Sequence, residues 1–213
     1  MTLFVDNHKN SLTLDDLIVL WQNRIANKSK YFGILTHKDP ADAWVYQEII
    51  FEKQPTVIIE IGNYFGGSTL MFAHWLDQIG NGRVIAVDID HERIDPLAKS
   101  HPRITWIQGD GWECASQVKQ LLKHDDKVMV VEDSSHHCEQ CYGVLQSYHS
   151  MVTSGQYMIV EDGICNHGLP WIPFPGPYEA VEQFLSTNND FVIDRSREDF
   201  LLTWNPKGFL LKT

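Results

Sequence analysis

VIIEIGNYFGGSTLMFA (residues 57–73) is the stretch of sequence that decides the fold. Its β-branched apolar run carries the acid Glu60 and leads into a glycine-rich turn, after which Ser68 opens a helical pattern. Gly62 and Gly66 allow the backbone to turn tightly and to approach a ligand closely, which a Cβ atom would obstruct. We therefore predict a buried strand, a ligand-binding loop and a helix, the arrangement that opens a nucleotide-binding sheet.

The ligand expected at this loop is a cation without phosphates. The glycines follow the spacing ExGxxxGGS instead of the GxGxxG spacing of dinucleotide-binding proteins, and the carboxylate of Glu60 would repel a pyrophosphate. S-adenosylmethionine, with its amino group and its sulfonium, fits such a site. The motif leaves two alternatives open, which are another nucleotide and a tight strand–helix connection that binds nothing.

Size and composition indicate one globular domain. The chain has 213 residues, of which 43% are hydrophobic and 21% are charged. We expect a single domain over residues 1–213, with a helical cover in residues 1–54 and a nucleotide-binding core in residues 55–213. The formal net charge of -11 argues against a nucleic-acid partner. Because neither a secretion signal nor an apolar run of membrane-spanning length is recognised, we expect a cytoplasmic protein without a membrane partner.

The four cysteines are expected to be free thiols, since a chain of this size needs no disulfides to fold. Cys138 and Cys141 form a CxxC pair beside His136 and His137, which resembles a zinc or redox motif. A second ligand pair at suitable spacing is missing, so two cysteines on one helix face are the preferred interpretation.

Strand and helix patterns alternate along the chain. Helices are predicted to begin at Thr13, which can form a capping box with Asp16, and at Asp39, which precedes a proline. Further parallel strands are predicted at residues 83–90, 104–110, 128–133 and 157–162, closing strands at 191–196, 199–204 and 208–213, and helices at 112–123, 139–152 and 178–186. This order predicts an α/β fold, a mostly parallel seven-stranded sheet with helices on both faces and an antiparallel edge strand.

Acids end several of the predicted strands, where a parallel sheet collects its ligands. Asp88 is placed to accept hydrogen bonds from ribose hydroxyls, or else to cap the next helix. Asp110, after Gly109, is placed to accept from an adenine amino group, or else to form a turn.

Asp133, Glu161 and Asp162 predict a metal site. The strands that precede them are expected to be neighbours, so three carboxylates would meet in one crevice and repel one another unless a cation joins them. Ligands that are all hard oxygen atoms favour Mg²⁺. Glu132 points to the other side of its strand and is a poorer ligand. Three solvated loop acids are the alternative interpretation.

His136, three residues after Asp133, is the candidate general base. Histidine is the side chain that can take up a proton near neutral pH, and from this position it would reach a hydroxyl bound at the metal. The adjacent His137 could take the same role. A capping or surface histidine is the alternative for either residue.

At this point the motifs resemble known families. EIGNYFGGS resembles the ExGxYxGxS signature of metal-dependent O-methyltransferases of the catechol type, in which the position of His136 often carries a lysine. Most of the chain is similar to the cephalosporin hydroxylase and rhamnosyl O-methyltransferase family, through DPADAWVYQEI, DSSHH, GPYEAVEQFL and DRSREDFLLTWNPKGFL. The resemblance implies a Rossmann-like class I methyltransferase fold, S-adenosylmethionine and Mg²⁺ as cofactors, and a homo-oligomer.

The resemblance also implies roles for individual residues. Those that would contact the methionine part and the loop are Glu60, Gly62, Tyr64, Gly66 and Ser68. Those that would contact the ribose and adenine are Asp88, Gly109 and Asp110. Asp133, Glu161 and Asp162 would bind the metal. Trp171, Phe174 and Tyr178 would line the acceptor side, unless they serve only in packing.

We therefore expect an S-adenosylmethionine-dependent, Mg²⁺-dependent O-methyltransferase that acts on a hydroxyl of a small molecule, either a sugar or a secondary metabolite. One alternative is a hydroxylase or a hydroxylase component. It would need two histidines and a carboxylate on iron. The pairs His37 with Asp39 and His124 with Asp126 have HxD spacing, but Asp39 is already the predicted helix cap and the second pair lies in a polar turn. The other alternative is a non-catalytic nucleotide-binding subunit.

Overall fold

The computed structural model describes residues 13–170 and 174–213. Its helices are α1 (Leu14–Lys28), α2 (Pro40–Lys53), α3 (Gly67–Ile79), α4 (Pro96–Lys99), α5 (Ala115–Gln120), α6 (Cys138–Tyr148), α7 (Pro177–Thr187) and the short 3-10 helix η1 (Arg195–Glu198). Its strands are β1 (Lys30–Tyr31), β2 (Ile34–Leu35), β3 (Val57–Ile61), β4 (Arg83–Asp88), β5 (Ile104–Gln108), β6 (Val128–Glu132), β7 (Tyr157–Val160), β8 (Phe191–Ile193) and β9 (Phe209–Lys212).

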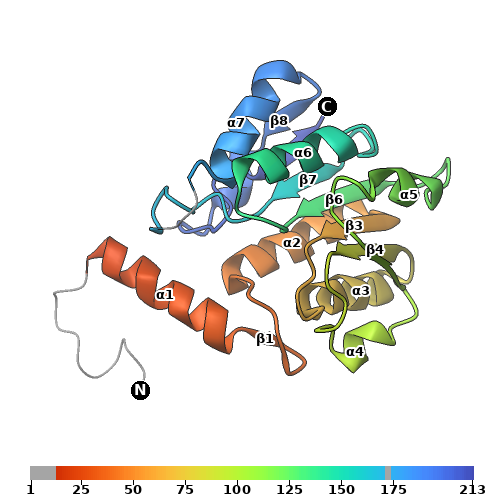
Figure 1. The fold of residues 1–213 in the computed structure, drawn as a ribbon, viewed down its shortest axis with the longest axis horizontal. Coiled ribbons are helices and arrows are strands. Elements are labelled where there is room, and N and C mark those ends of the chain that lie inside the picture. Colours follow the sequence, from red (N-terminus) through yellow and green to blue (C-terminus); the bar gives the residue numbers. More distant parts are fainter. Residues whose placement is uncertain (1–12, 171–173) are drawn as a thin grey trace.

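Seven strands form the predicted sheet, in the order β5-β4-β3-β6-β7-β9-β8 (Figure 1). The pairings among β3 to β7 are parallel, whereas β9 runs antiparallel to both of its neighbours. The neighbouring strands β6 and β7 confirm the pairing expected for the acids that follow them. β1 and β2 form a separate two-stranded antiparallel ribbon, which the sequence patterns did not predict.

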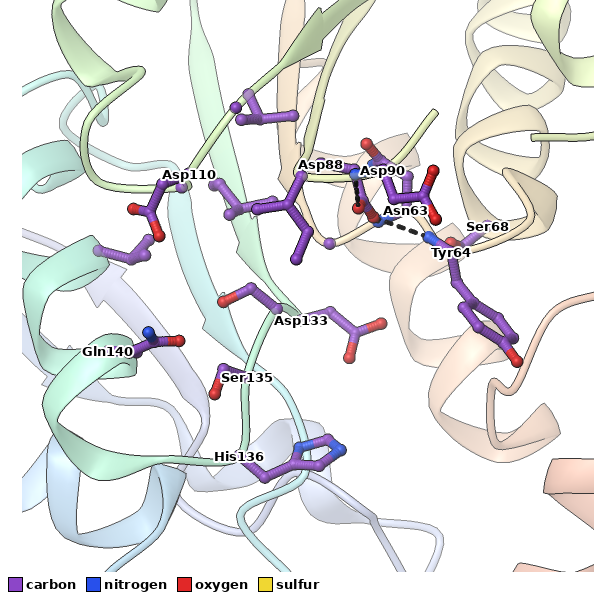
Figure 2. Close-up of a pocket in the computed structure, with 18 of the residues that line it drawn as sticks. Asn63, Tyr64, Ser68, Asp88, Asp90, Asp110, Asp133, Ser135, His136 and Gln140 are labelled. Carbon is purple, nitrogen blue, oxygen red and sulfur yellow. Dashed lines mark hydrogen bonds between the residues drawn. The ribbon is translucent and has the colours of Figure 1, made fainter. Parts of the chain in front are cut away.

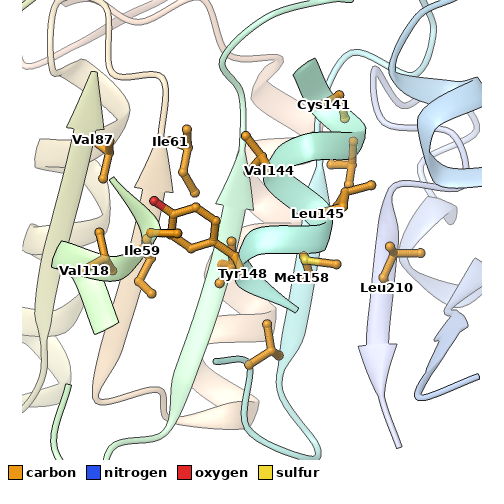
Figure 3. Packing of buried hydrophobic residues seen from close by; sticks show 14 of the residues in the cluster. Ile59, Ile61, Val87, Val118, Cys141, Val144, Leu145, Tyr148, Met158 and Leu210 are labelled. Atoms are coloured by element: carbon orange, nitrogen blue, oxygen red, sulfur yellow. The ribbon is translucent and has the colours of Figure 1, made fainter. Parts of the chain in front are cut away.

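The core has two layers because side chains alternate along the central strands. Ile59 and Ile61 of β3 pack against α5, α6 and α7, with Tyr148 of α6 at the centre of this layer (Figure 3). Ile58 faces the opposite side and packs against α2 and α3. All residues of β3 are buried, as a continuous apolar run in a parallel sheet requires. Helices therefore cover both faces, as predicted.

The N-terminal helices begin at the predicted residues and cover different surfaces. Thr13 and Asp16 form the capping box of α1, and Asp39 caps α2 through the backbone N–H groups of Ala41 and Asp42. α2 packs on the sheet beside α3. Figure 1 shows that α1 lies beside the sheet. The buried Ile18 and Ile25 of α1 contact the segments that follow β7 and precede β9.

The strand predicted at residues 199–204 is wrong. This segment follows η1 and turns, with Leu201 at a φ of 67° and its side chain 95% exposed. Such a φ is incompatible with extended backbone. The apolar residue Trp204 instead packs against α1, in the cluster that contains Ile18 and Ile25.

No helix in the two described segments is long and apolar enough to cross a membrane. The four cysteines are free, as predicted, and all four are buried. Cys141 is on the face of α6 that packs into the core. The Sγ atom of Cys138 lies 3.9 Å from Oε1 of Gln183. The CxxC pair is therefore part of the packing face of a helix.

Candidate functional site

A cavity of about 480 Å³ lies at the carboxyl edge of β3, β4, β5 and β6 (Figure 2). This volume is within the range of small-molecule sites. The predicted residues that line it are Gly62, Tyr64, Ser68, Asp88, Gly109, Asp110, Asp133, His136 and Asp162. The predicted residues that do not line it are Glu60, Gly66 and Glu161.

The glycine loop is shaped by close backbone contact. Gly62 has a φ of 89°, and a Cβ atom there would lie 2.0 Å from the carbonyl oxygen of Asp133. Gly66 has a φ of 80° at the start of α3, and a Cβ atom there would lie 2.9 Å from the Cβ atom of Ala98. Both positions require glycine for conformation and for space. Gly62 thereby brings the loop against the end of β6, where the acidic residues begin.

Glu60 holds the glycine loop in place through hydrogen bonds of its buried side chain. Its side chain is fully buried, and its Oε2 atom accepts hydrogen bonds from Nδ2 of Asn63, at 2.9 Å, and from the hydroxyl of Thr69. Burial raises the pKa of Glu60, while the charge of Lys38 lowers it. The carboxylate therefore braces the loop, and Glu60 is not among the residues that line the cavity.

Asp88 organises the same loop from the end of β4. Its Oδ2 atom accepts from the backbone N–H groups of Asn63, at 2.6 Å, and Tyr64, at 2.9 Å, and its Oδ1 atom accepts from that of Asp90, at 3.0 Å. Dashed lines in Figure 2 mark hydrogen bonds of the Asp88 carboxylate. Hydrogen bonds from amides to a carboxylate are stronger than those between neutral groups. Asp88 thus faces the cavity in a fixed orientation, and the neighbouring Asp90 also lines it.

Asp110 stands at the end of β5, across the cavity from the loop. Its Oδ1 atom accepts from the backbone N–H of Trp112 at 3.1 Å, which fixes a turn of the kind named above as its alternative role. Its carboxylate still borders the cavity, on the same side as Gln140 (Figure 2). The turn and the cavity wall are therefore compatible roles for this residue.

Two of the acids that follow β6 and β7 contact the ammonium group of a lysine, Lys38. Nζ of Lys38 donates to Oδ2 of Asp133 at 2.5 Å and to Oε1 of Glu161. Lys38 is only 3% exposed, and buried lysines are rare unless paired. The ammonium group therefore stands between two carboxylates that were predicted to share a metal.

Asp162 faces a different partner. Its Oδ2 atom lies 3.5 Å from Nδ1 of His136. Burial raises the pKa of Asp162 to about 6, although the charge of His136 lowers it. Burial also raises the pKa of Glu161 well above its usual range, and the charge of Asp133 raises it further. Glu161 and Asp162 thus behave as crowded carboxylates that need positive charge beside them.

With the Lys38 ammonium group in this position, the three predicted metal ligands are not arranged around one shared metal position. Among residues 13–170 and 174–213, no group of three His, Cys, Asp or Glu side chains is spaced to hold a metal ion. The donor chemistry still suits Mg²⁺, because oxygen atoms of Asp133 and Glu161 face a single position from two sides. Lys38 fills that position.

His136 and His137 are placed differently. His136 lines the cavity with its ring toward Asp162, and its side chain is 31% exposed. His137 is the exposed residue that precedes α6 and does not line the cavity. The geometry therefore favours His136 as the side chain that could reach a bound ligand.

Three residues around the cavity have left-handed backbone although they are not glycine. These are His37 (φ 56°), Tyr64 (φ 49°) and Asp162 (φ 57°). Such conformations cost free energy and concentrate at functional sites. The side chain of Asn205 supports one of them, because its Oδ1 atom accepts from the backbone N–H of Asp162 at 3.0 Å.

Sequence reasoning missed Lys38, Asn63, Asp90 and Asn205. Asp90 had a local signal, since it follows Asp88 by two residues in the same acidic strand end. Lys38 had none, because it lies 95 residues from Asp133 in a segment before the first strand of the main sheet.

Two of the aromatic residues predicted for the acceptor side, Phe174 and Tyr178, are not among the described residues that line the cavity. Trp171 lies outside the described residues. Phe174 is 68% exposed, and the ring of Tyr178 stacks on that of His167 with centroids 3.8 Å apart. For Tyr178 this ring contact fits the packing role named as the alternative, and an acceptor role for either residue stays a prediction.

The HxD pairs do not form an iron site. His37 lines the cavity, but Asp39 accepts the N–H groups that cap α2 and that of the Trp21 indole, at 2.6 Å. Asp126 accepts from the guanidinium of Arg83, which begins β4, and it is therefore at the opposite edge of the sheet.

Comparisons with known proteins agree with this geometry. Residues 23–213 match the model of the family described as rhamnosyl O-methyltransferase/CmcI. The chain is 34% identical over 198 residues to the rhamnosyl O-methyltransferase of Mycobacterium bovis, covering 89% of this chain and 80% of that protein. It is 35% identical to the corresponding protein of Mycobacterium leprae, covering 89% of this chain and 86% of that one.

Solved structures share the fold at lower identity. CmcI with Mg and SAM superposes with a TM-score of 0.70 at 21% identity, covering 98% of this chain and 88% of that chain. The O-methyltransferase TomG of Streptomyces achromogenes in complex with SAM gives 0.58 at 15% identity, covering 82% and 80%. The fold is that of the class I methyltransferases, and by its sequence the chain belongs to the rhamnosyl O-methyltransferase/CmcI family.

Proposed function

We propose that the protein transfers a methyl group from S-adenosylmethionine to a hydroxyl of a small molecule, with a sugar as the favoured acceptor class and Mg²⁺ as the cofactor. The observation that carries the proposal is that the glycine loop, Asp133 and His136 border one cavity. The relatives at 34% and 35% identity are named rhamnosyl O-methyltransferases, which supports both the reaction and the acceptor class.

The donor would occupy the half of the cavity bordered by the loop and by Asp88. Remaining lone pairs of the Asp88 carboxylate, together with Asp90, would accept the ribose hydroxyls. Asp110 and Gly109 would lie at the adenine. The sulfonium would then face the acidic half of the cavity, where negative charge favours it over the neutral thioether product.

Asp133, Glu161 and Asp162 would hold the divalent ion. A bound Mg²⁺ would lower the pKa of an acceptor hydroxyl and orient its oxygen. His136, which is held toward Asp162, would accept the proton as the oxygen attacks the methyl carbon. Alignment of the two reactants in one cavity is worth up to about 7–11 kcal/mol of barrier lowering.

The direct test incubates the purified protein with S-adenosylmethionine, MgCl₂ and a panel of rhamnosides, other sugars and phenols. Release of S-adenosylhomocysteine that depends on an acceptor and stops with EDTA supports the proposal. Consumption of oxygen with substrate, without S-adenosylhomocysteine, would indicate the hydroxylase alternative. Cofactor binding without methyl transfer to any acceptor would indicate a binding subunit.

We also propose that the protein is a cytoplasmic homo-oligomer. Trp44 and Phe51 on α2 are 59% and 69% exposed, and large exposed apolar side chains are typical of interfaces. Four buried free thiols suit a reducing compartment. Light scattering on the purified protein tests the assembly: a mass of one chain would contradict it.

A further inference from the structure

Lys38 is a buried charge that the proposed reaction does not use. Its ammonium group donates to Asp133 and Glu161 from a side chain that is 3% exposed. The two carboxylates that accept from this ammonium group offset the cost of burying its charge. A cation of the chain therefore lies against Asp133, which lines the cavity.

The backbone that carries Lys38 is fixed by both N-terminal helices. The hydroxyl of Ser29, which follows α1, donates to the carbonyl of Lys38 at 2.7 Å. The next residue, Asp39, caps α2 and accepts from the indole of Trp21 in α1 at 2.6 Å. Only the four-carbon side chain is free to change position without breaking these contacts.

A divalent ion and the Lys38 ammonium cannot share this position. Mg²⁺ lies about 2.0–2.1 Å from its oxygen ligands. An ion bound by both Asp133 and Glu161 would fall where Nζ now lies, at 2.5 Å from the Asp133 oxygen. The two cations would also repel each other at short range in a partly dehydrated site.

We propose that Lys38 occupies the divalent-ion position of the ion-free protein and competes with the ion for Asp133 and Glu161. The inference rests on the proposed function, because it assigns the same carboxylates to the metal. Lys38 keeps the buried acids compensated when no ion is bound, and its side chain swings out when the ion enters. The affinity of the site for divalent ions is thereby set by a residue that is not a ligand.

The test replaces the ammonium by an uncharged side chain of similar length, Lys38→Met, and uses Mn²⁺ as the probe. Free Mn²⁺ is counted by electron paramagnetic resonance, without substrate or turnover. We expect the dissociation constant for Mn²⁺ to be at least about tenfold lower in Lys38→Met than in the unmodified protein, because a competing charge is gone. Equal or weaker binding, or no binding to either protein, overturns the inference.

Two controls test whether the gain in Mn²⁺ affinity is specific to Lys38 and depends on Asp133. Lys30→Met removes an exposed lysine from β1, in the segment that precedes Lys38, and should leave Mn²⁺ binding unchanged. Asp133→Asn in the Lys38→Met background should abolish the tight binding. A tenfold gain in Mn²⁺ affinity in Lys30→Met would show that the gain is not specific to Lys38. Tight Mn²⁺ binding that survives Asp133→Asn would show that the ion binds at another site. Either outcome overturns the inference.

A second measurement uses the unmodified protein, in case Lys38→Met does not fold. Acetylation of lysines, mapped by mass spectrometry, should increase at Lys38 when Mg²⁺ is added and stay constant at Lys30. Constant protection of Lys38 with Mg²⁺ overturns the displacement. Methyl transfer is scored separately: tight Mn²⁺ binding by Lys38→Met without activity in any protein contradicts the proposed function and leaves the competition standing.

Discussion

The two halves of the cavity hold their carboxylates in different ways. In the half formed by β3, β4 and β5, three backbone N–H groups donate to Asp88. In the half formed by β6 and β7, Asp133 and Glu161 face the Lys38 ammonium. Backbone amides are fixed by the fold, whereas a lysine side chain can leave. The half around Asp88 is therefore organised by backbone groups, and in our proposal the acidic half exchanges its cation.

We expect the largest effect on methyl transfer from a substitution of Asp133, which should leave the donor half of the cavity intact. Asp133→Asn removes a carboxylate from the proposed metal site while the loop contacts of Asp88 remain. We expect methyl transfer to fall at least about 100-fold, because a metal contributes several kcal/mol to transition-state stabilisation. The affinity for S-adenosylmethionine should change less than about threefold by calorimetry. Normal turnover in this variant would refute the metal role.

The next effect concerns the base in the acidic half. His136→Gln should lower kcat by about 10²–10⁴-fold, which is the usual contribution of general base catalysis. His137→Gln is the matched control and should stay near the parent rate, because His137 does not line the cavity. Steady-state kinetics at saturating Mg²⁺ measures both. Equal losses in the two variants would remove the distinction between them.

Asp88→Asn tests the other half. An amide oxygen can replace only one of the two carboxylate oxygens that receive the backbone N–H groups of Asn63, Tyr64 and Asp90. We expect the dissociation constant for S-adenosylmethionine to rise about 10–100-fold, the equivalent of losing about one charge-assisted hydrogen bond. Binding of Mn²⁺ by the Lys38→Met protein should be unaffected by this change. Joint loss of both ligands would show that the halves are not separate.

The smallest expected effect concerns Asp42, a buried acid outside the cavity. Its hydrogen-bond donors are a hydroxyl and a backbone N–H, whereas those of Asp133 and Glu161 include the Lys38 ammonium. Asp42 is 3% exposed and accepts from the hydroxyl of Thr203, at 2.6 Å, and the N–H of Trp204, at 2.7 Å. Burial raises its pKa from 3.8 to about 7. The folded protein therefore holds this proton more tightly than the unfolded chain, and the stabilisation is lost as the pH rises toward and through 7.

Asp42→Asn removes this titration. From pH 5.5 to pH 8 the unmodified protein should lose about 1–2 kcal/mol more of its free energy of unfolding than the variant does. Urea unfolding at the two pH values measures the difference. Parallel pH dependence in both proteins would show that Asp42 is already ionised at pH 5.5.

The sequence predicted the sheet well because buried parallel strands are continuous apolar runs, such as Val57–Ile61 and Val128–Glu132. It failed at residues 199–204, where Leu202 and Trp204 pack in the cluster with Ile18 and Ile25 of α1, while Leu201 is 95% exposed. Among site residues it placed Asp88 and Asp133 at the cavity, because the ends of parallel strands meet at one edge.

Contacts between distant segments could not be predicted in the same way. Lys38 lies between β2 and α2, 95 residues before Asp133, and no local pattern encodes their contact. Glu60 was expected to face the ligand. Its carboxylate turns to Asn63 and Thr69, which the loop conformation brings within reach.

The most direct test of the two-halves account is calorimetry of S-adenosylmethionine binding with EDTA and with excess Mg²⁺. A donor site organised by backbone amides predicts binding in EDTA, with a dissociation constant within about threefold of that in Mg²⁺. Binding that appears only when Mg²⁺ is present would contradict the account, because the donor half would then depend on the cation of the other half.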